Sequence, residues 1–386
     1  MKSTHSDKLE RWLGVEATQR LSNQFKDFYA PVRVNGVPGN VFIMPGGGFA
    51  GEIAVGNFMS AQDAAALTIK KIKARLDAKA KFNNATKNLI QLIEIGDRRL
   101  LSVGAFSTID SVIAAYTGGK AQQLAFNKTG VASNAIGNVN DLWTRAGQPA
   151  AGAAGAAAPG GSVPTATTTG ALGYGNLGVV ANGGHYLNWV LSSSVIGNSL
   201  LLYDRLFSVA KTINSTTAET VTGVPTRYQS GTSGNVDYIG GNFVFPANPT
   251  TVLAATAHNW TFNYNNQASA AKTSATQAGV SAGVVGGVDL SVGNWFIPLA
   301  AGDVGVKAIT SMTCSALVAT GTIDFVIGHA LAANACPLAN LACLDDGLNT
   351  ANLINIMDNA CLSFLELPKP TTTATNYSGI VRTVSE

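Results

Sequence analysis

The chain has 386 residues and a net charge of +3, and 46% of its residues are apolar while only 12% are charged, against about 25% charged in an average soluble protein. It contains no run of about 20 apolar residues, which excludes a membrane-spanning helix. Met1–His5 lead into a charged amphipathic segment, so we expect no secretory signal.

The low charge content is typical of a surface that other subunits cover. The alternative is a monomer whose surface is built from Thr, Ser and Asn. The length allows two domains, or one large domain with an arm.

The charges are unevenly distributed along the chain. Residues 1–145 contain 18 Lys and Arg against 11 Asp and Glu, whereas residues 146–386 contain 7 against 11. A basic front half (+7) therefore joins a slightly acidic back half (−4). The pattern predicts an N-terminal region at 1–145 with an arm, a Gly-rich hairpin loop and a basic helix, then an Ala/Gly/Pro connector at 146–170, then a β-rich domain at 171–386.

The front half begins with a predicted amphipathic helix. Over residues 7–28 large apolar residues recur at near-helical spacing, and Pro31 ends the pattern. Residues 34–49 alternate short β-prone runs with Gly and Pro, which predicts an extended hairpin or loop. A second helix is predicted from Ser60 to about Phe82, since Ser60 and Asp63 form a capping-box-like start.

The second helix is strongly basic. Seven positive charges and one acid, Asp77, lie between residues 70 and 87. Clustered Lys and Arg can contact phosphate groups without reading bases, whereas the plainer interpretation is a solvated helix face. If this helix faces nucleic acid, the contacting side chains are those of Lys70, Lys71, Lys73, Lys79 and Lys81.

The segments that follow are short. Leu89–Ile95 fits a strand or a helix, and residues 107–116 predict a short helix. Residues 146–161 carry no large side chain, so they cannot form a core; such a segment is either a flexible linker or is ordered by contacts from elsewhere. We expect neighbouring subunits to supply those contacts.

The back half alternates apolar and polar residues with a period of two, as strands do. Turn-forming clusters separate these runs, which predicts an antiparallel β-sandwich of jelly-roll type. A late helix is predicted at about 350–358, followed by a buried strand at 361–367 that Pro368 ends. The alternating runs are Phe243/Phe245, Trp260/Phe262/Tyr264 and Ile323/Phe325/Ile327.

Gly46–Gly51 match G-x-G-x-x-G, but the context is wrong for a dinucleotide site. Pro45 precedes the match and no helical pattern follows it. Lys70 and Lys71 stand where an acidic residue should lie about 20 positions on. We expect no cofactor, and interpret the glycines as a mobile or closely packed loop.

Gly279–Gly283 match G-x-S-x-G, with Ser281 as the serine and Asp303 or Asp324 and then His329 following in hydrolase order. A nucleophile elbow needs an apolar strand before the serine and a helix after it. The flanking residues are small and polar before the match and Gly-rich after it, so chance explains the match better and we expect no enzyme.

The histidines and cysteines offer little for a metal. His329 with Cys336 and Cys343 is a conceivable zinc set, but the spacing does not favour it. Asp345-Asp346-Gly347 lacks the ligand pattern of a calcium loop and reads better as a turn before the next helix. We expect the four cysteines to be buried thiols, with a Cys336–Cys343 bridge as the alternative.

The back half resembles virion structural proteins of tailed bacteriophages. The resemblance spans about residues 140–386 and lies in turns and strands, at Leu142-Trp143 and in the segments 148–152, 183–189, 200–206, 222–228, 296–305 and 360–366. It implies a protein present in many copies in the particle, with no catalytic residues. The front-half order of arm, Gly-rich hairpin and long helix is similar to major capsid proteins of the HK97-like fold, which is the alternative architecture.

The expected fold is therefore mixed α+β but mainly β, and the expected function is a capsid or head-shell component of a virion assembled in the bacterial cytoplasm. Its partners would be copies of itself, other virion proteins and packaged nucleic acid, with no membrane. We expect the arm and hairpin to dock on neighbours through Trp12, Phe25, Phe28, Phe42 and Phe49.

Two other classes of function remain open. A trimeric decoration protein or tail adhesin would bind a surface glycan, and exposed aromatic side chains near Tyr238 or Tyr377 would favour it. A serine hydrolase built on Ser281 is the enzyme alternative.

Overall fold

The computed structural model describes residues 29–34, 37–42, 106, 108–346, 353–367 and 370–386. The chain divides into two compact units, Met1–Asp97 and Arg98–Glu386. In the first unit, β1 (Tyr29–Val34) and β2 (Val37–Phe42) pair antiparallel as a hairpin. The helices predicted at 7–28 and 60–82, the run at 89–95 and the glycine motif at 46–51 lie outside the described residues.

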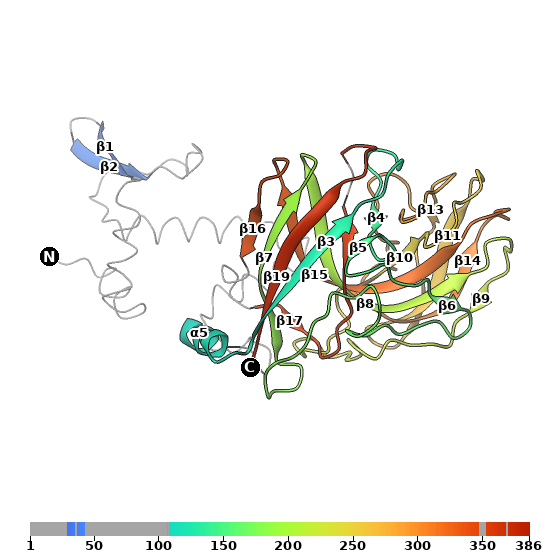
Figure 1. Cartoon of the computed structure of the whole chain (residues 1–386), viewed down its shortest axis with the longest axis horizontal. Helices are drawn as coiled ribbons and strands as arrows, with labels where there is room; N and C mark the ends of the chain where they lie inside the picture. Colours follow the sequence, from blue (N-terminus) through green and yellow to red (C-terminus); the bar gives the residue numbers. More distant parts are fainter. Residues whose placement is uncertain (1–28, 35–36, 43–105, 107, 347–352, 368–369) are drawn as a thin grey trace. The chain divides into compact units, whose positions relative to one another are not determined.

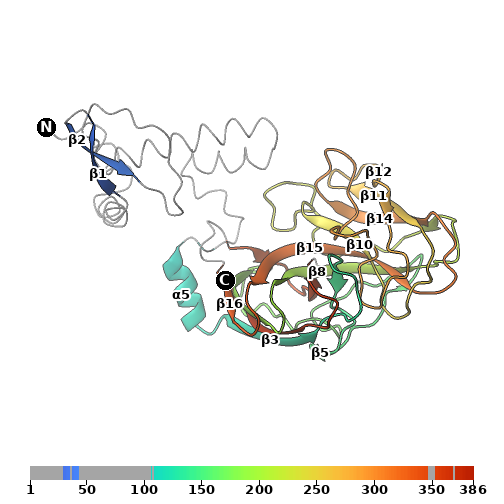
Figure 2. The same cartoon turned by 90° about the horizontal axis from the view of Figure 1, so that it is seen from above.

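The second unit is mainly β, as expected, and its described residues form three sheets (Figures 1 and 2). The central sheet has the order β10-β15-β8-β18-β4, with β6 added beside β8 in parallel. Its strands are β4 (Asn140–Asp141), β6 (Ala156–Ala157), β8 (Asn198–Lys211), β10 (Asn242–Ala247), β15 (Ile323–Cys336) and β18 (Leu362–Glu366).

The other two sheets, called here the β7 sheet and the β11 sheet, are antiparallel. The β7 sheet has the order β16-β7-β19-β3-β5 with β17 beside β7, and the β11 sheet has the order β12-β11-β14-β9 with β13 beside β11. The strands of the β7 sheet are β3 (Ala121–Thr129), β5 (Gly147–Gln148), β7 (Gly184–Ser193), β16 (Cys343–Asp346), β17 (Asn355–Ile356) and β19 (Asn376–Ser385). The strands of the β11 sheet are β9 (Glu219–Thr220), β11 (Asn259–Asn266), β12 (Ala271–Thr273), β13 (Gln277–Ala278) and β14 (Val306–Cys314).

The central sheet is buried on both faces, so it belongs to two cores. Along β8, Leu200 and Leu202 join the core shared with the β7 sheet, whereas Leu201 and Tyr203 join the core shared with the β11 sheet. Successive side chains of a strand point to opposite faces, and a strand covered on both faces reads as an unbroken apolar run. This is why residues 200–203 are all apolar or aromatic.

The short helix predicted at 107–116 is confirmed as α5 (Ile109–Thr117). Thr108 caps it, because its side chain accepts a hydrogen bond from the Ser111 backbone N–H and the Ser111 hydroxyl oxygen accepts one from the Thr108 N–H. Val112 and Ala115 are buried in a small cluster with Leu187 and Val384. No helix in the described part of the chain is long and apolar enough to span a bilayer.

The connector is ordered by its own chain, so the expectation that neighbouring subunits must supply its contacts is wrong. Ala153 O accepts a hydrogen bond from the Trp143 indole N–H (2.7 Å), and the Gly155 N–H donates to Asp324 Oδ2 (2.5 Å). Residues in β5 and β6 pair with β3 and β8. Small residues allow this close approach of backbone to side chain, and the connector thus packs inside the unit that starts at Arg98.

The period-two runs form strands β10, β11 and β15, and the predicted strand at 361–367 forms β18. The helix predicted at 350–358 is wrong where the structure describes it, because Asn355 and Ile356 pair with β7 as β17. Ile356 is fully buried in the core of the β7 sheet. Burial and strand pairing outweigh a weak helical propensity here.

Candidate functional site

The predicted assembly and nucleic-acid residues fall outside the part of the chain whose side chains are described. Phe42 is the last residue of β2. The other predicted assembly and nucleic-acid residues lie outside the described residues altogether. They are Trp12, Phe25, Phe28, Phe49, Lys70, Lys71, Lys73, Lys79 and Lys81.

The residues of the hydrolase motif have separate partners. Ser281 is exposed and follows β13 with no helix after it. The carboxylate of Asp303 accepts bonds from the Tyr264 hydroxyl (2.6 Å) and the Asn266 amide, and Asp324 accepts from Gly155. The His329 ring stacks on Tyr228 with centroids 3.7 Å apart and is bonded through Nδ1 to Asn242.

Burial lowers the pKa of His329 to about 4. The ring is therefore neutral near pH 7, stacked and already bonded. Among the described residues no hydrogen bond joins Ser281, His329 and either carboxylate.

All four cysteines are free thiols. The expectation of buried thiols is confirmed for Cys314, Cys336 and Cys361, whereas Cys343 is half-buried. Burial, with a smaller effect of neighbouring Cys343, raises the pKa of Cys336 to about 11. Asp345 and Asp346 lie in strand β16, not in a turn before a helix. No group of three or more metal-ligating side chains occurs in the described residues.

An apolar row crosses the outer face of the β7 sheet. Leu344 pairs with Val190, Val190 with Ile380, and Ile380 with Ala125. The residues that flank these positions, such as Trp189 and Val381, point the other way into the core, so the row faces away from it. This set, the outer row, includes Leu344, which is 62% exposed.

Helix α5 adds a second exposed apolar stripe at the same end of the unit (Figures 1 and 2). Ile109, Ile113 and Tyr116 stand at i, i+4 and i+7, which is one helix face. Ile109 and Ile113 are each 54% exposed, although Val112 and Ala115 on the adjoining side of the helix are buried. A cluster of large exposed apolar side chains marks an interaction surface more often than scattered ones do.

The surface of the described unit has little positive charge. Of the Lys and Arg residues that the structure describes in this unit, only Lys272 is exposed, whereas Lys128, Arg205, Lys211 and Arg227 are buried. Binding to a polyanion needs clustered exposed cations. The described residues of this unit therefore form no polyanion-binding face.

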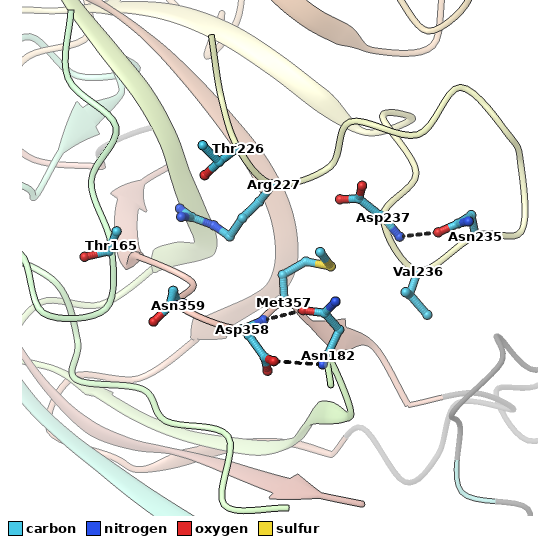
Figure 3. A pocket seen from close by; sticks show the side chains of 10 residues that line it. All are labelled: Thr165, Asn182, Thr226, Arg227, Asn235, Val236, Asp237, Met357, Asp358 and Asn359. Atoms are coloured by element: carbon cyan, nitrogen blue, oxygen red, sulfur yellow. Dashed lines mark hydrogen bonds between the residues drawn. The ribbon is translucent and has the colours of Figure 1, made fainter. Parts of the chain in front are cut away.

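A pocket of about 470 Å³ opens on this unit (Figure 3). Asp358 is held on one wall: its backbone N–H donates to Asn182 Oδ1 (2.9 Å), and its carboxylate accepts from the Asn182 N–H (3.0 Å). Asp237 lies on another wall, where its backbone N–H donates to Asn235 Oδ1 (2.9 Å). The lining residues are Thr165, Asn182, Thr226, Arg227, Asn235, Val236, Asp237, Met357, Asp358 and Asn359.

The amino-acid sequence carries no signal for this pocket. Its walls come from four separate stretches of the chain, at 165, 182, 226–237 and 357–359, and no motif spacing connects them. Comparison of the whole chain with protein-family models, with curated proteins and with solved structures gives no match.

Proposed function

We propose that this chain is a structural protein of a tailed-bacteriophage virion, a capsid or head-shell component that packs against copies of itself around the genome. The observation that carries the proposal is the outer row together with the α5 stripe, an exposed apolar surface on a unit with few exposed charges. Burial of apolar surface is the dominant favourable term in most protein–protein association.

A second copy is the occupant that fits this surface best. The cross-strand row beside the outer row contains Asp346, Asn188 and Arg382 in register, with one acid and one base. Arg382 Nη1 donates to Asn188 Oδ1 (3.0 Å). A face with balanced charge does not repel its own copy.

The proposed architecture is a jelly-roll-like sandwich on a helical arm. The antiparallel sheets support the sandwich part of this proposal, but the central sheet lies between two cores, which makes three layers where a jelly roll has two. The spine helix of the HK97-like alternative would fall at 60–82, outside the described residues. In the proposal the arm and hairpin residues from Trp12 to Phe49 dock on neighbours, and the lysines from Lys70 to Lys81 contact packaged nucleic acid. Assembly takes place in the bacterial cytoplasm, and other virion proteins join the particle.

The two tyrosines named for the glycan-binding alternative differ in exposure, and neither is fully exposed. Tyr377 is fully buried and its hydroxyl donates to Glu366 (2.6 Å). Tyr238 is only half-buried, but its ring lies against Gly240, where an added Cβ would meet Tyr238 Cε1 at 2.1 Å.

The mass and symmetry of the native assembly test the proposal. We expect the full chain to form large closed assemblies. Asp substituted for Leu344 and Ile380 should shift them toward the single chain, whereas Val252→Asp, at a position 53% exposed away from the β7 sheet, should leave them intact. A wild-type chain that stays at single-chain mass at every concentration overturns the proposal, and a discrete trimer or ring supports the decoration or adhesin alternative.

A further inference from the structure

The pocket of Figure 3 has an apolar base between polar walls. Met357 is 6% exposed and lies between Asp237 and Asp358 in this view, and Val236 and the carbon chain of Arg227 add further apolar surface. A volume of about 470 Å³ is in the size range of small-ligand sites, although most of the residues that line this pocket are polar.

The one cation in the lining is already neutralised. Arg227 Nε and Nη2 donate to the two carboxylate oxygens of Asp204 at 2.8 and 2.7 Å. Nη2 also donates to the carbonyls of Pro164 and Arg205. In Figure 3 the guanidinium end points away from Asp237, so it leaves the pocket with two carboxylates and no free cation among its lining residues.

Asp237 is the unusual member of the lining. The residue is half-buried, and its side chain makes no hydrogen bond or ion pair with any described residue. Its Oδ1 is shielded from solvent, so Oδ2 is the oxygen that a ligand in the pocket can reach. A buried acceptor without a partner is costly. Asp358, by contrast, accepts from the Asn176 amide (2.8 Å) and the Asn182 N–H.

We propose that this pocket binds a ligand with an alkylammonium or guanidinium group, whose N–H donors bond to the Asp237 carboxylate while its alkyl chain lies on Met357. A cation supplies the donor and the charge that Asp237 lacks. An anionic ligand would meet two carboxylates. A bare metal ion would leave most of the volume unused, and the described residues contain no metal-ligand cluster.

Two sources can provide this group: a free polyamine-like small molecule, or a Lys or Arg side chain of a second copy of this chain. The charge difference between the front half (+7) and the back half (−4) is compatible with the second source. The site itself does not depend on the proposed function.

Calorimetric titration of the full chain with n-butylammonium chloride tests the site, with n-butanol and sodium butyrate as the neutral and anionic analogues. We expect saturable binding of n-butylammonium alone. Asp237→Asn should weaken it about 10-fold or more, since charge-assisted hydrogen bonds are about twice as strong as neutral ones. Because the Asp237 carboxylate has no partner among the described residues, this variant breaks no bond and should have a Tm equal to or above that of the wild type. Asp110→Asn, which removes an exposed acid on α5, is the matched control and should bind as the wild type does.

A second variant checks the same pocket without removing a carboxylate. Thr226 is exposed and lines it, so Thr226→Lys places a tethered ammonium there and should block n-butylammonium.

The mass of the Asp237→Asn assembly then separates the two sources of the cation, a free small molecule and a side chain of a second copy. A loss of assembly, with competition by n-butylammonium in the wild type, identifies a side chain of a second copy, and unchanged assembly identifies a free small cation. Absence of saturable binding, equal binding of n-butanol, or an Asp237→Asn variant that binds like the wild type overturns the proposal.

Discussion

His258 donates a hydrogen bond from Nε2 to Oδ2 of Asp289 across 2.6 Å, inside the core, where the two side chains are 0% and 1% exposed. The other ring nitrogen, Nδ1, lies 2.8 Å from the carbonyl oxygen of Thr256. A carbonyl and a carboxylate only accept hydrogen bonds, so the two partners favour a ring that is protonated on both nitrogens, the imidazolium form. Asp289 also accepts from the Trp260 indole N–H and the Val280 N–H, and the pair therefore fixes the loop that contains Ser281.

Replacing His258 with Gln should remove a pH-dependent part of the stability. Burial lowers the pKa of His258, but the hydrogen bond and charge of Asp289 and the Thr256 carbonyl outweigh it and raise the pKa above its usual value. The stabilisation is thus complete below about pH 6.5, the unfolded value, and is lost as pH rises through the folded pKa. Urea unfolding between pH 6 and 9 should show a decline in the wild type that His258→Gln lacks; parallel curves would contradict the imidazolium.

Asp324 should give stability that increases on mild acidification. Burial raises its pKa to about 6, against the opposing effects of the Gly155 N–H and Arg205, whereas the unfolded pKa is about 3.9. Between these values the folded state binds a proton that the unfolded chain does not, so the free energy of unfolding rises by about 2 kcal/mol as pH falls from 7 to 4. Asp324→Asn, measured by the same unfolding, should lack this rise relative to the wild type.

Gly152 should tolerate no side chain, because a Cβ there would lie 2.2 Å from Trp143 Cε2. Gly152→Ala should lower the free energy of unfolding by about 1–3 kcal/mol, as overpacking does. Gly160 lies in the same connector with nothing within 4 Å of its Cβ position, so Gly160→Ala is the control and should change stability by less than about 0.5 kcal/mol. Limited proteolysis should then cut the connector only in Gly152→Ala, and equal protection of both variants would count against packing by the chain itself.

Arg227→Lys should destabilise the fold much more than Arg382→Lys. Arg227 donates two bonds to the buried carboxylate of Asp204, which also accepts from the Cys361 N–H (2.8 Å), and a lysine cannot reproduce that planar fork. Breaking a buried pair costs about 3–5 kcal/mol. Arg382 is half-buried, and its side chain makes one hydrogen bond with the described residues, to Asn188, so its replacement should cost under about 1 kcal/mol. Chemical unfolding of both variants measures the difference in their free energies of unfolding. Similar losses of stability would show that the two-bond contact of Arg227 with Asp204 is not especially stabilising.

Local sequence patterns determined the elements whose residues face a single core. Trp260, Phe262 and Tyr264 alternate with polar residues because β11 is buried on one face only, and its burial follows that alternation. The N-terminal capping residues of α5 likewise lie within four positions of one another. Such patterns depend only on neighbours along the chain.

Only the tertiary structure decided the remainder. Asn355 and Ile356 form a strand because β7 offers them partners about 170 positions away, and the connector is ordered because Trp143 and Asp324 contact its backbone. The His258–Asp289 pair and the pocket around Asp237 also join residues from distant segments. Contacts across large sequence separations leave no periodic pattern, since each partner looks like an ordinary polar or small residue until the chain folds.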